Sequence, residues 1–195
     1  MRASLLLSFA LVASFASAAA AQPASVETEL VKGRCRFIAD DGEVGDYAEK
    51  RCPGLAGAQV YTVARSSRVS LSLRWGKKKA DDIVESWSLG TKLEWRGLGR
   101  RQAFKPYAAI VTAIVREEET DKNHNVLAVL RIEPRNACLA AAIDVEANKD
   151  ALAMARRTAD IDAPKFTCGS DKPRVVGAAG LAAQAVIGSG GEPPK

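Results

Sequence analysis

The chain has 195 residues, of which 47% are hydrophobic and 26% charged, and a formal net charge of +5. A chain of this length is expected to form one domain. After the N-terminal leader no segment has 18 uninterrupted apolar residues, which argues against a helical membrane anchor in the mature protein.

Residues 1–21 have the composition of a secretory signal peptide. One positive charge, Arg2, precedes an apolar run from Leu5 to Phe15 and then a string of small residues. The run is shorter than the roughly 20 residues of a membrane span, and Ala19 and Ala21 fit the small-residue rule for cleavage. We therefore expect cleavage near Ala21 and a periplasmic or secreted mature protein.

The chain has four cysteines, which an oxidising compartment favours as disulfides. Four cysteines allow three connectivities, and the sequence alone leaves all three open. Because each neighbouring pair brackets one compact stretch, we favour Cys35 with Cys52 and Cys138 with Cys168. A structural zinc site is the alternative, but no CxxC pair is present.

The stretch "CRFIADDGEVGDYAEKRC", residues 35–52, raises the question of a metal-binding loop. Four of its carboxylates, within residues 40–46, could act as calcium ligands, yet the EF-hand pattern is absent and acidic residues with glycine are also typical of a solvated turn. The sequence therefore predicts a hairpin stapled by a disulfide, with no metal. The carboxylates are those of Asp40, Asp41, Glu43 and Asp46.

Strand patterns dominate the middle of the chain. In residues 69–75 apolar and polar side chains alternate, which indicates a strand with one buried face, joined to a preceding strand in a hairpin. "TKLEWRG" repeats the alternation. Residues 107–134 contain two runs rich in Ile and Val around a polar turn, which predict a longer hairpin that Pro134 ends.

The last third predicts one more strand, Cys138 to Val145, and then a helix. We expect this helix from about 148 to 160, with Asn148 as N-cap and an alanine stripe that lies against the sheet. The Gly-rich tail is expected to be mobile, with at most a short helical turn near 181–186. The predicted domains are a signal peptide at 1–21, a single domain at 22–168 and a tail at 169–195.

The fold class expected from these elements is α+β. It consists of one antiparallel sheet of about six strands, with one C-terminal helix packed on one face and disulfides as staples.

Few residues point to catalysis. His124 is the only histidine and lies in the polar turn, where we expect it to be exposed and without a catalytic role. The common nucleophile, metalloprotease and nucleotide-binding motifs are absent, and no cofactor is expected. A pair of carboxylates brought together by the fold stays possible. The pattern favours a non-enzymatic protein over an enzyme.

Residues 74–101 contain all three tryptophans among many cations. Trp75 continues the alternation of Leu71 and Leu73, so we expect it to face the core, whereas Trp87 lies outside any alternation and is free to face water. Aromatic and cationic side chains together can hold a partner. The alternative is a set of core residues with a solvated turn. The predicted partner-binding residues are Trp87, Lys77, Lys78, Lys79, Arg100 and Arg101.

Four phrases taken together, "RCPGLAGAQVYTV", "SRVSLSL", "KLEWRG" and "NACLAAAIDVEANKDALAMARRTADIDAPKFTC", resemble a group of small exported bacterial proteins of unassigned function. In that group a cysteine-led strand precedes an Asn- and Ala-rich helix and an aromatic-x-Cys sequence. The similar region spans Cys35 to Cys168. The chain departs from the group at Ser67, where an acidic residue is expected. The resemblance implies no activity, so no catalytic residue is transferred.

We therefore expect an exported, non-enzymatic protein, monomeric, that binds a partner in the periplasm or cell envelope. The partner is expected to be a protein, for example a secreted hydrolase that this protein inhibits, or an anionic envelope polymer. Nucleic acid is not expected as a partner, because an exported protein leaves the cytoplasm. The alternative function is a hydrolase that acts on an envelope polymer through carboxylates.

Overall fold

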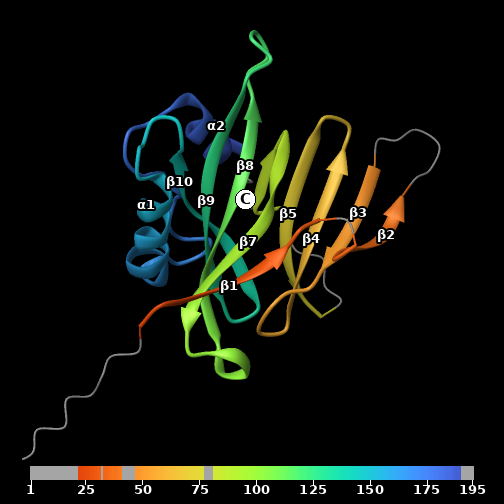
Figure 1. Cartoon of the computed structure of the whole chain (residues 1–195), viewed down its shortest axis with the longest axis vertical. Helices are drawn as coiled ribbons and strands as arrows, with labels where there is room; N and C mark the ends of the chain where they lie inside the picture. Colours follow the sequence, from red (N-terminus) through yellow and green to blue (C-terminus); the bar gives the residue numbers. More distant parts are fainter. Residues whose placement is uncertain (1–21, 32, 41–46, 77–80, 190–195) are drawn as a thin grey trace, which may run out of the picture.

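The computed structural model of the chain describes residues 22–31, 33–40, 47–76 and 81–189. These residues form two β-sheets that pack against each other, and one helix with the helical turns that follow it covers the outer face of the larger sheet (Figure 1). The expected signal peptide and its cleavage site lie outside the described residues.

The smaller sheet has five strands, which are antiparallel and follow one another in chain order. The predicted alternating strand is β5, and the turn Ser66–Ser67 joins it to β4 as expected. The strands are β2 (Arg36–Asp40), β3 (Tyr47–Cys52), β4 (Ala58–Arg65), β5 (Arg68–Trp75) and β6 (Val84–Ser86).

The larger sheet has six strands in the order β1-β7-β8-β9-β10-β11. The predicted long hairpin is β8 with β9, and β9 ends directly before Pro134. A single 3-10 turn, Arg101–Ala103, lies between β7 and β8. The strands are β1 (Ala24–Glu29), β7 (Ser88–Leu98), β8 (Lys105–Arg116), β9 (Asn123–Glu133), β10 (Asn136–Asp144) and β11 (Arg174–Val175).

The predicted fold, one antiparallel sheet of about six strands with a single C-terminal helix, is wrong. The described residues are mostly β, the strands divide between two sheets, β10 and β11 run parallel, and a second helix is present. Alternation identifies a strand with a buried face, but it does not say which sheet the strand joins. The chain passes between the sheets after β1 and again after β6, and no local pattern marks either crossing.

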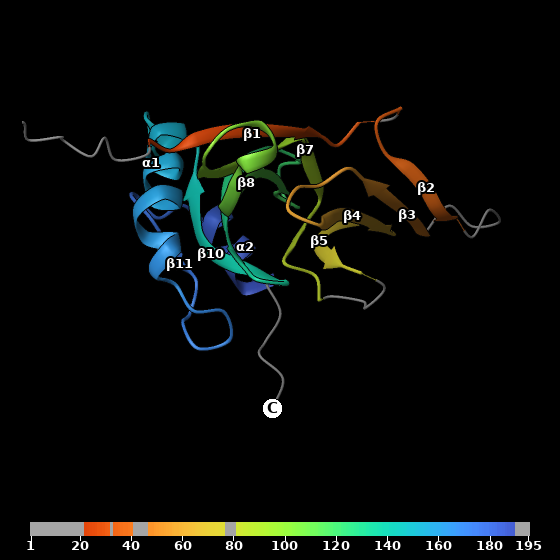
Figure 2. The same ribbon diagram turned by 90° about the horizontal axis from the view of Figure 1, so that it is seen from below.

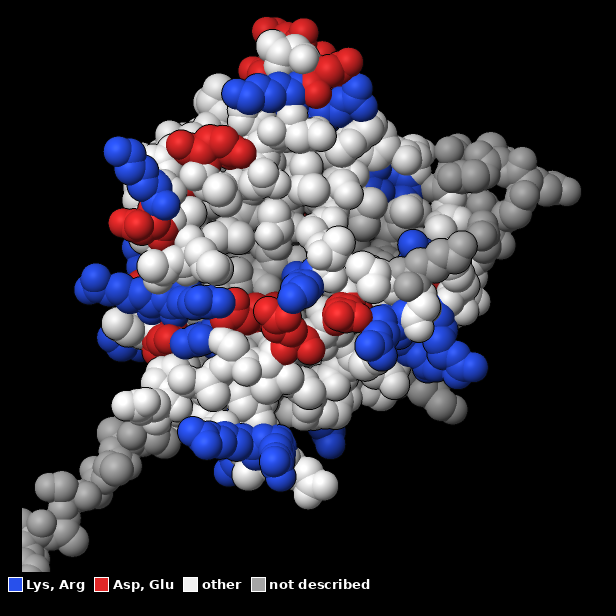
Figure 3. All heavy atoms as spheres, viewed as in Figure 1, with Lys and Arg blue, Asp and Glu red and all other residues white. Residues whose placement is uncertain are grey.

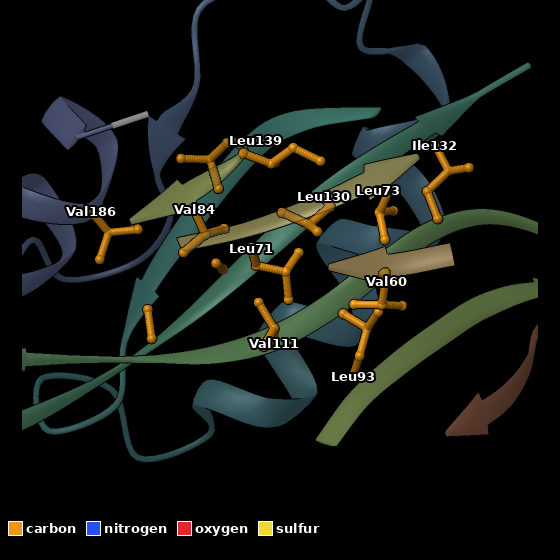
Figure 4. Packing of buried hydrophobic residues seen from close by; sticks show 14 of the residues in the cluster. Val60, Leu71, Leu73, Val84, Leu93, Val111, Leu130, Ile132, Leu139 and Val186 are labelled. Atoms are coloured by element: carbon orange, nitrogen blue, oxygen red, sulfur yellow. The ribbon is translucent and has the colours of Figure 1, made fainter. Parts of the chain in front are cut away.

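The main hydrophobic core lies between the two sheets (Figure 4). Leu71 and Leu73 of β5 face Leu93 and Trp95 of β7, and all four are almost completely buried. The indole Nε1 of Trp95 donates a hydrogen bond to Thr28 Oγ1 at 2.9 Å. A buried indole needs such an acceptor, because an unpaired N–H would lose its bond to water without replacement.

A smaller apolar cluster lies on the outer face of the larger sheet, under helix α1 (Ala151–Arg157), which a π-helical turn, Thr158–Asp162, and a 3-10 turn, Ala163–Lys165, continue (Figure 2). Of the predicted apolar stripe, Ala151, Ala155 and Ala159 are buried against the sheet as expected, whereas Met154 is only partly buried. Small side chains let the helix approach the sheet closely. The buried stripe consists of Ala151, Ala155, Ala159 and Ala163.

The helical turn predicted near 181–186 is present in the tail, and it packs against the rest of the molecule. Helix α2 (Leu181–Ser189) places Ala183 and Val186 in the core between the sheets. Asn148, expected as the N-cap of α1, instead fastens the tail, since its Nδ2 donates to Ala178 O at 3.1 Å and its Oδ1 accepts from Ala178 N at 2.9 Å. The helix N-cap is Asp150, which makes no side-chain capping bond.

Both predicted disulfides are confirmed. Cys35–Cys52 closes the base of the β2–β3 hairpin, and Cys138–Cys168 joins β10 to the segment that follows the helical turns. Asp41, Glu43 and Asp46 lie outside the described residues, and the described ranges contain no cluster that could hold a metal. None of the helices in the described ranges has the length and apolarity needed to cross a bilayer.

Candidate functional site: the Trp87 cleft

Trp87 is the single residue between β6 of the smaller sheet and β7 of the larger sheet. Because the chain changes sheets here, the side chain belongs to neither alternation, and 38% of Trp87 is exposed. The guanidinium carbon of Arg116, on β8, lies 4.5 Å from the centre of the indole ring. This is a cation–π contact, so one face of the ring is already occupied.

A cleft of about 470 Å³ opens beside Trp87, which we call the Trp87 cleft. Four parts of the fold meet around it: the β4–β5 turn, β6, the β8–β9 hairpin and helix α2. The residues that line it are Ser67, Arg68, Glu85, Ser86, Trp87, Val115, Arg116, Glu118, Asp121, Ala185 and Val186.

The charges of the Trp87 cleft are mixed. Asp121 Oδ1 accepts from Nε and Nη2 of Arg116, at 3.0 and 2.7 Å, and so holds the guanidinium over the indole. Arg68 lies 3.8 Å from Glu85, measured between Nη1 and Oε1. At the tip of the β8–β9 hairpin, at the top of Figures 1 and 3, acidic and basic side chains lie together. The cleft therefore lacks the strong positive potential that a polyanion would require.

His124 lies close to this tip, at the start of β9, and 24% of its side chain is exposed. Its Nε2 is 3.7 Å from Glu117 Oε2, and Thr120 donates a hydrogen bond to the same carboxylate. The hydrogen bond from Thr120, with a smaller contribution from His124, lowers the pKa of Glu117. His124 does not line the Trp87 cleft.

Of the predicted partner-binding residues, the structure places Arg100 and Arg101 far from Trp87. Arg100 and Arg101 follow the far end of β7, whose 11 residues separate them from Trp87 by about 35 Å at the usual rise per residue. Lys77, Lys78 and Lys79 lie outside the described residues. The neighbours that Trp87 does have, Arg116 and Asp121, come from another hairpin, and no local sequence signal connects them with it.

The three tryptophans have different environments. Trp95 is in the core, and Trp87 lines the cleft. Trp75 was expected in the core, but it is only partly buried: it ends β5 at the opposite side of the molecule from the Trp87 cleft and packs against the edge of the core.

A cluster of charged residues lies on the outer face of the larger sheet, beside α1. The carboxylate of Glu94 accepts hydrogen bonds from Arg156 at 3.0 and 3.1 Å and from Ser25 at 2.5 Å. Arg96 binds Asp160 through Nε at 3.0 Å and Nη2 at 2.6 Å. The cluster joins β7 to the helical layer.

The pKa values in this cluster do not suit acid catalysis. Burial raises the pKa of Glu94, but the hydrogen bonds from Arg156 and Ser25 and the charges of Arg156 and Arg96 outweigh it, so the pKa falls below its usual range. The pKa of Tyr107 is raised by burial and by its hydrogen bond to Asp160. The general acid of a glycosidase needs a raised carboxyl pKa, so Glu94 gives the hydrolase alternative no support.

Comparison of the chain with protein-family models, with characterised proteins and with solved structures found no match. The resemblance to small exported bacterial proteins therefore stays a prediction, and the candidate site depends on geometry alone.

Proposed function

We propose that the protein is an exported, non-enzymatic binding protein that holds a partner protein of the periplasm or cell envelope in the Trp87 cleft. The composition of the leader and the two disulfides support export, since disulfides form and persist in oxidising compartments. A secreted hydrolase that the protein inhibits is one form of such a partner.

The observation that carries the proposal is the exposed indole of Trp87 under the guanidinium of Arg116, which Asp121 holds in place. Trp and Arg are the side chains that most often dominate the binding energy of protein interfaces. A guanidinium that is already oriented also loses less conformational freedom when a partner binds. These two side chains are therefore suited to the centre of an interface.

A protein segment suits the cleft better than an anionic polymer does. The wall includes apolar side chains, Val115 and Val186, while Glu118 and Asp121 would repel a polyanion. A segment with an apolar residue between polar ones can place the apolar residue against Trp87 and its polar groups against both signs of charge.

The test is capture from an envelope extract with the purified protein as bait, followed by titration of the identified partner. We expect the Trp87→Ala variant to weaken the partner's affinity at least tenfold, because truncation removes most of the contact area of the ring. The matched control is Leu98→Ala, because Leu98 is an apolar residue of similar exposure, 41%, at the other end of β7. A partner that binds both variants as tightly as the natural protein would exclude the Trp87 cleft as its site.

The Asp121→Asn variant tests the role of the oriented guanidinium. It removes the charge that holds Arg116 and should weaken binding severalfold without a change in fold. Affinity should also fall with added salt, since exposed charges are screened within about 10 Å at 0.1 M salt. Binding that is independent of salt and of Asp121 would leave only the apolar contribution of Trp87.

A further inference from the structure

A second cleft, of about 760 Å³, lies at the opposite end of β5 from the Trp87 cleft, and we call it the Trp75 cleft. It opens between the two sheets, where β5 ends, β8 begins and the β9–β10 turn follows. The side chains that bound it are chiefly those of Trp75, Pro106, Ile132, Glu133, Pro134 and Arg135.

Part of the wall of the Trp75 cleft is apolar. Trp75 is partly exposed, Ile132 is almost buried, and the two prolines present rigid rings. Gly57 lies beside the indole, at a position where a Cβ atom would be 3.9 Å from Trp75 Cδ1. A planar or chain-like apolar group can therefore lie against the indole and displace water from it.

The two charged side chains of this wall, Glu133 and Arg135, differ in their hydrogen bonding. Both carboxylate oxygens of Glu133 are engaged: Oε1 accepts from the backbone N–H of Cys168 at 3.1 Å and Oε2 from Asn136 Nδ2 at 3.4 Å. Arg135 is exposed and, among the described residues, has neither a hydrogen-bond nor an ion-pair partner. The residue has a φ of +64°, in the left-handed region, and so occupies a tight turn whose backbone direction is fixed.

From this arrangement we propose that the Trp75 cleft binds a small amphipathic anion, with its apolar body against Trp75 and its carboxylate, sulfonate or phosphate group on Arg135. The guanidinium suits such a head group because it can donate two parallel hydrogen bonds to it. Glu133 keeps its negative charge, because both of its partners are neutral, but it makes no ion pair with Arg135, so the guanidinium is left for the head group. This site is independent of the partner proposed for the Trp87 cleft, so either proposal can fail alone.

The first probe is 1-anilinonaphthalene-8-sulfonate, whose fluorescence rises when its rings leave water. We expect saturable binding at one site, at least tenfold tighter than that of N-phenyl-1-naphthylamine, which has the same rings without the sulfonate. Arg135→Gln should reduce the affinity for the sulfonate to that for the uncharged analogue, and Arg135→Lys should restore part of it. Trp75→Phe should keep more affinity for both probes than Trp75→Ala.

The second probe is dodecanoate, used below its micellar concentration. If it displaces the sulfonate, the cleft accepts an anion with an aliphatic body; if it does not, the cleft prefers an aromatic body. Trp87→Ala is the control and should leave the affinities unchanged. Each variant must first show the cooperative melting of the natural protein, because partly unfolded chains also bind such dyes. The proposal is overturned if the sulfonate does not bind, or if Arg135→Gln and Trp75→Ala bind it as the natural protein does.

Discussion

Trp87 and Trp95 belong to the same stretch of chain but have opposite environments. Trp95 lies within β7, fully buried between the sheets, with its N–H paired to Thr28. Trp87 lies just before β7, at the crossing between sheets, exposed beside a cleft. The two residues differ because Trp95 lies in the middle of a strand whose face is committed to the core, whereas Trp87 lies at a crossing between sheets and is committed to neither face.

The largest expected effect is that of Trp95→Ala. Removal of this side chain leaves a cavity in the core and an unpaired Thr28, and should lower the free energy of unfolding by about 3 to 5 kcal/mol. Urea denaturation measures the change. A loss below about 1 kcal/mol would mean that the core between the sheets can rearrange around the gap, and the contrast with Trp87 would fail.

Loss of the Cys138–Cys168 disulfide comes next. In the chain-entropy model a cross-link between residues 30 positions apart contributes roughly 3 to 4 kcal/mol. The double change to Ser should lower the denaturation midpoint accordingly, yet leave binding at the Trp87 cleft unchanged below the new midpoint. Loss of binding while the chain is still folded would show that the shape of the Trp87 cleft depends on the helical layer that this disulfide holds.

Glu94→Gln tests the face of β7 opposite to Trp95. Glu94 accepts hydrogen bonds from Arg156 and Ser25, so the neutral amide should cost about 1 to 3 kcal/mol at neutral pH. Because the folded pKa of Glu94 lies below its unfolded value, its contribution is present above about pH 4.3 and is lost as pH falls through the folded pKa.

Thermal unfolding of both proteins from pH 7 to pH 3 measures this contribution. The stability difference between the natural protein and Glu94→Gln should shrink as the pH falls. A difference that stays constant over this range would contradict the lowered pKa of Glu94.

The smallest effect on stability is expected for Trp87→Ala. The ring is exposed and leaves no closed cavity, so the loss should stay below about 1 kcal/mol, from the contact with Arg116 and some apolar area. The same urea experiment as for Trp95→Ala provides the measurement. If both variants lose the same stability, Trp87 is a structural residue and the cleft loses its central binding group.

The sequence by itself determined the local features of this protein. Residues 69–75 alternate and form β5, although Ser70 and Ser72 are buried there as well as the apolar residues, so the expected solvent-facing side is absent. The alanines from 151 to 159 recur at helical spacing, and the favoured cysteine pairs, one of three possible connectivities, each enclose a compact stretch. In each case the interacting groups are near in sequence, or the burial pattern of one element is enough.

Only the tertiary structure decided the rest. Which sheet a strand joins, that α2 enters the core, that Asn148 holds the tail at Ala178 and that Arg116 covers Trp87 all depend on contacts between distant segments. The pattern of one segment records that a face is buried or a side chain is polar, but not what lies opposite. The separation of Arg100 from Trp87, by contrast, follows from the length of β7, since an extended strand carries its two ends far apart.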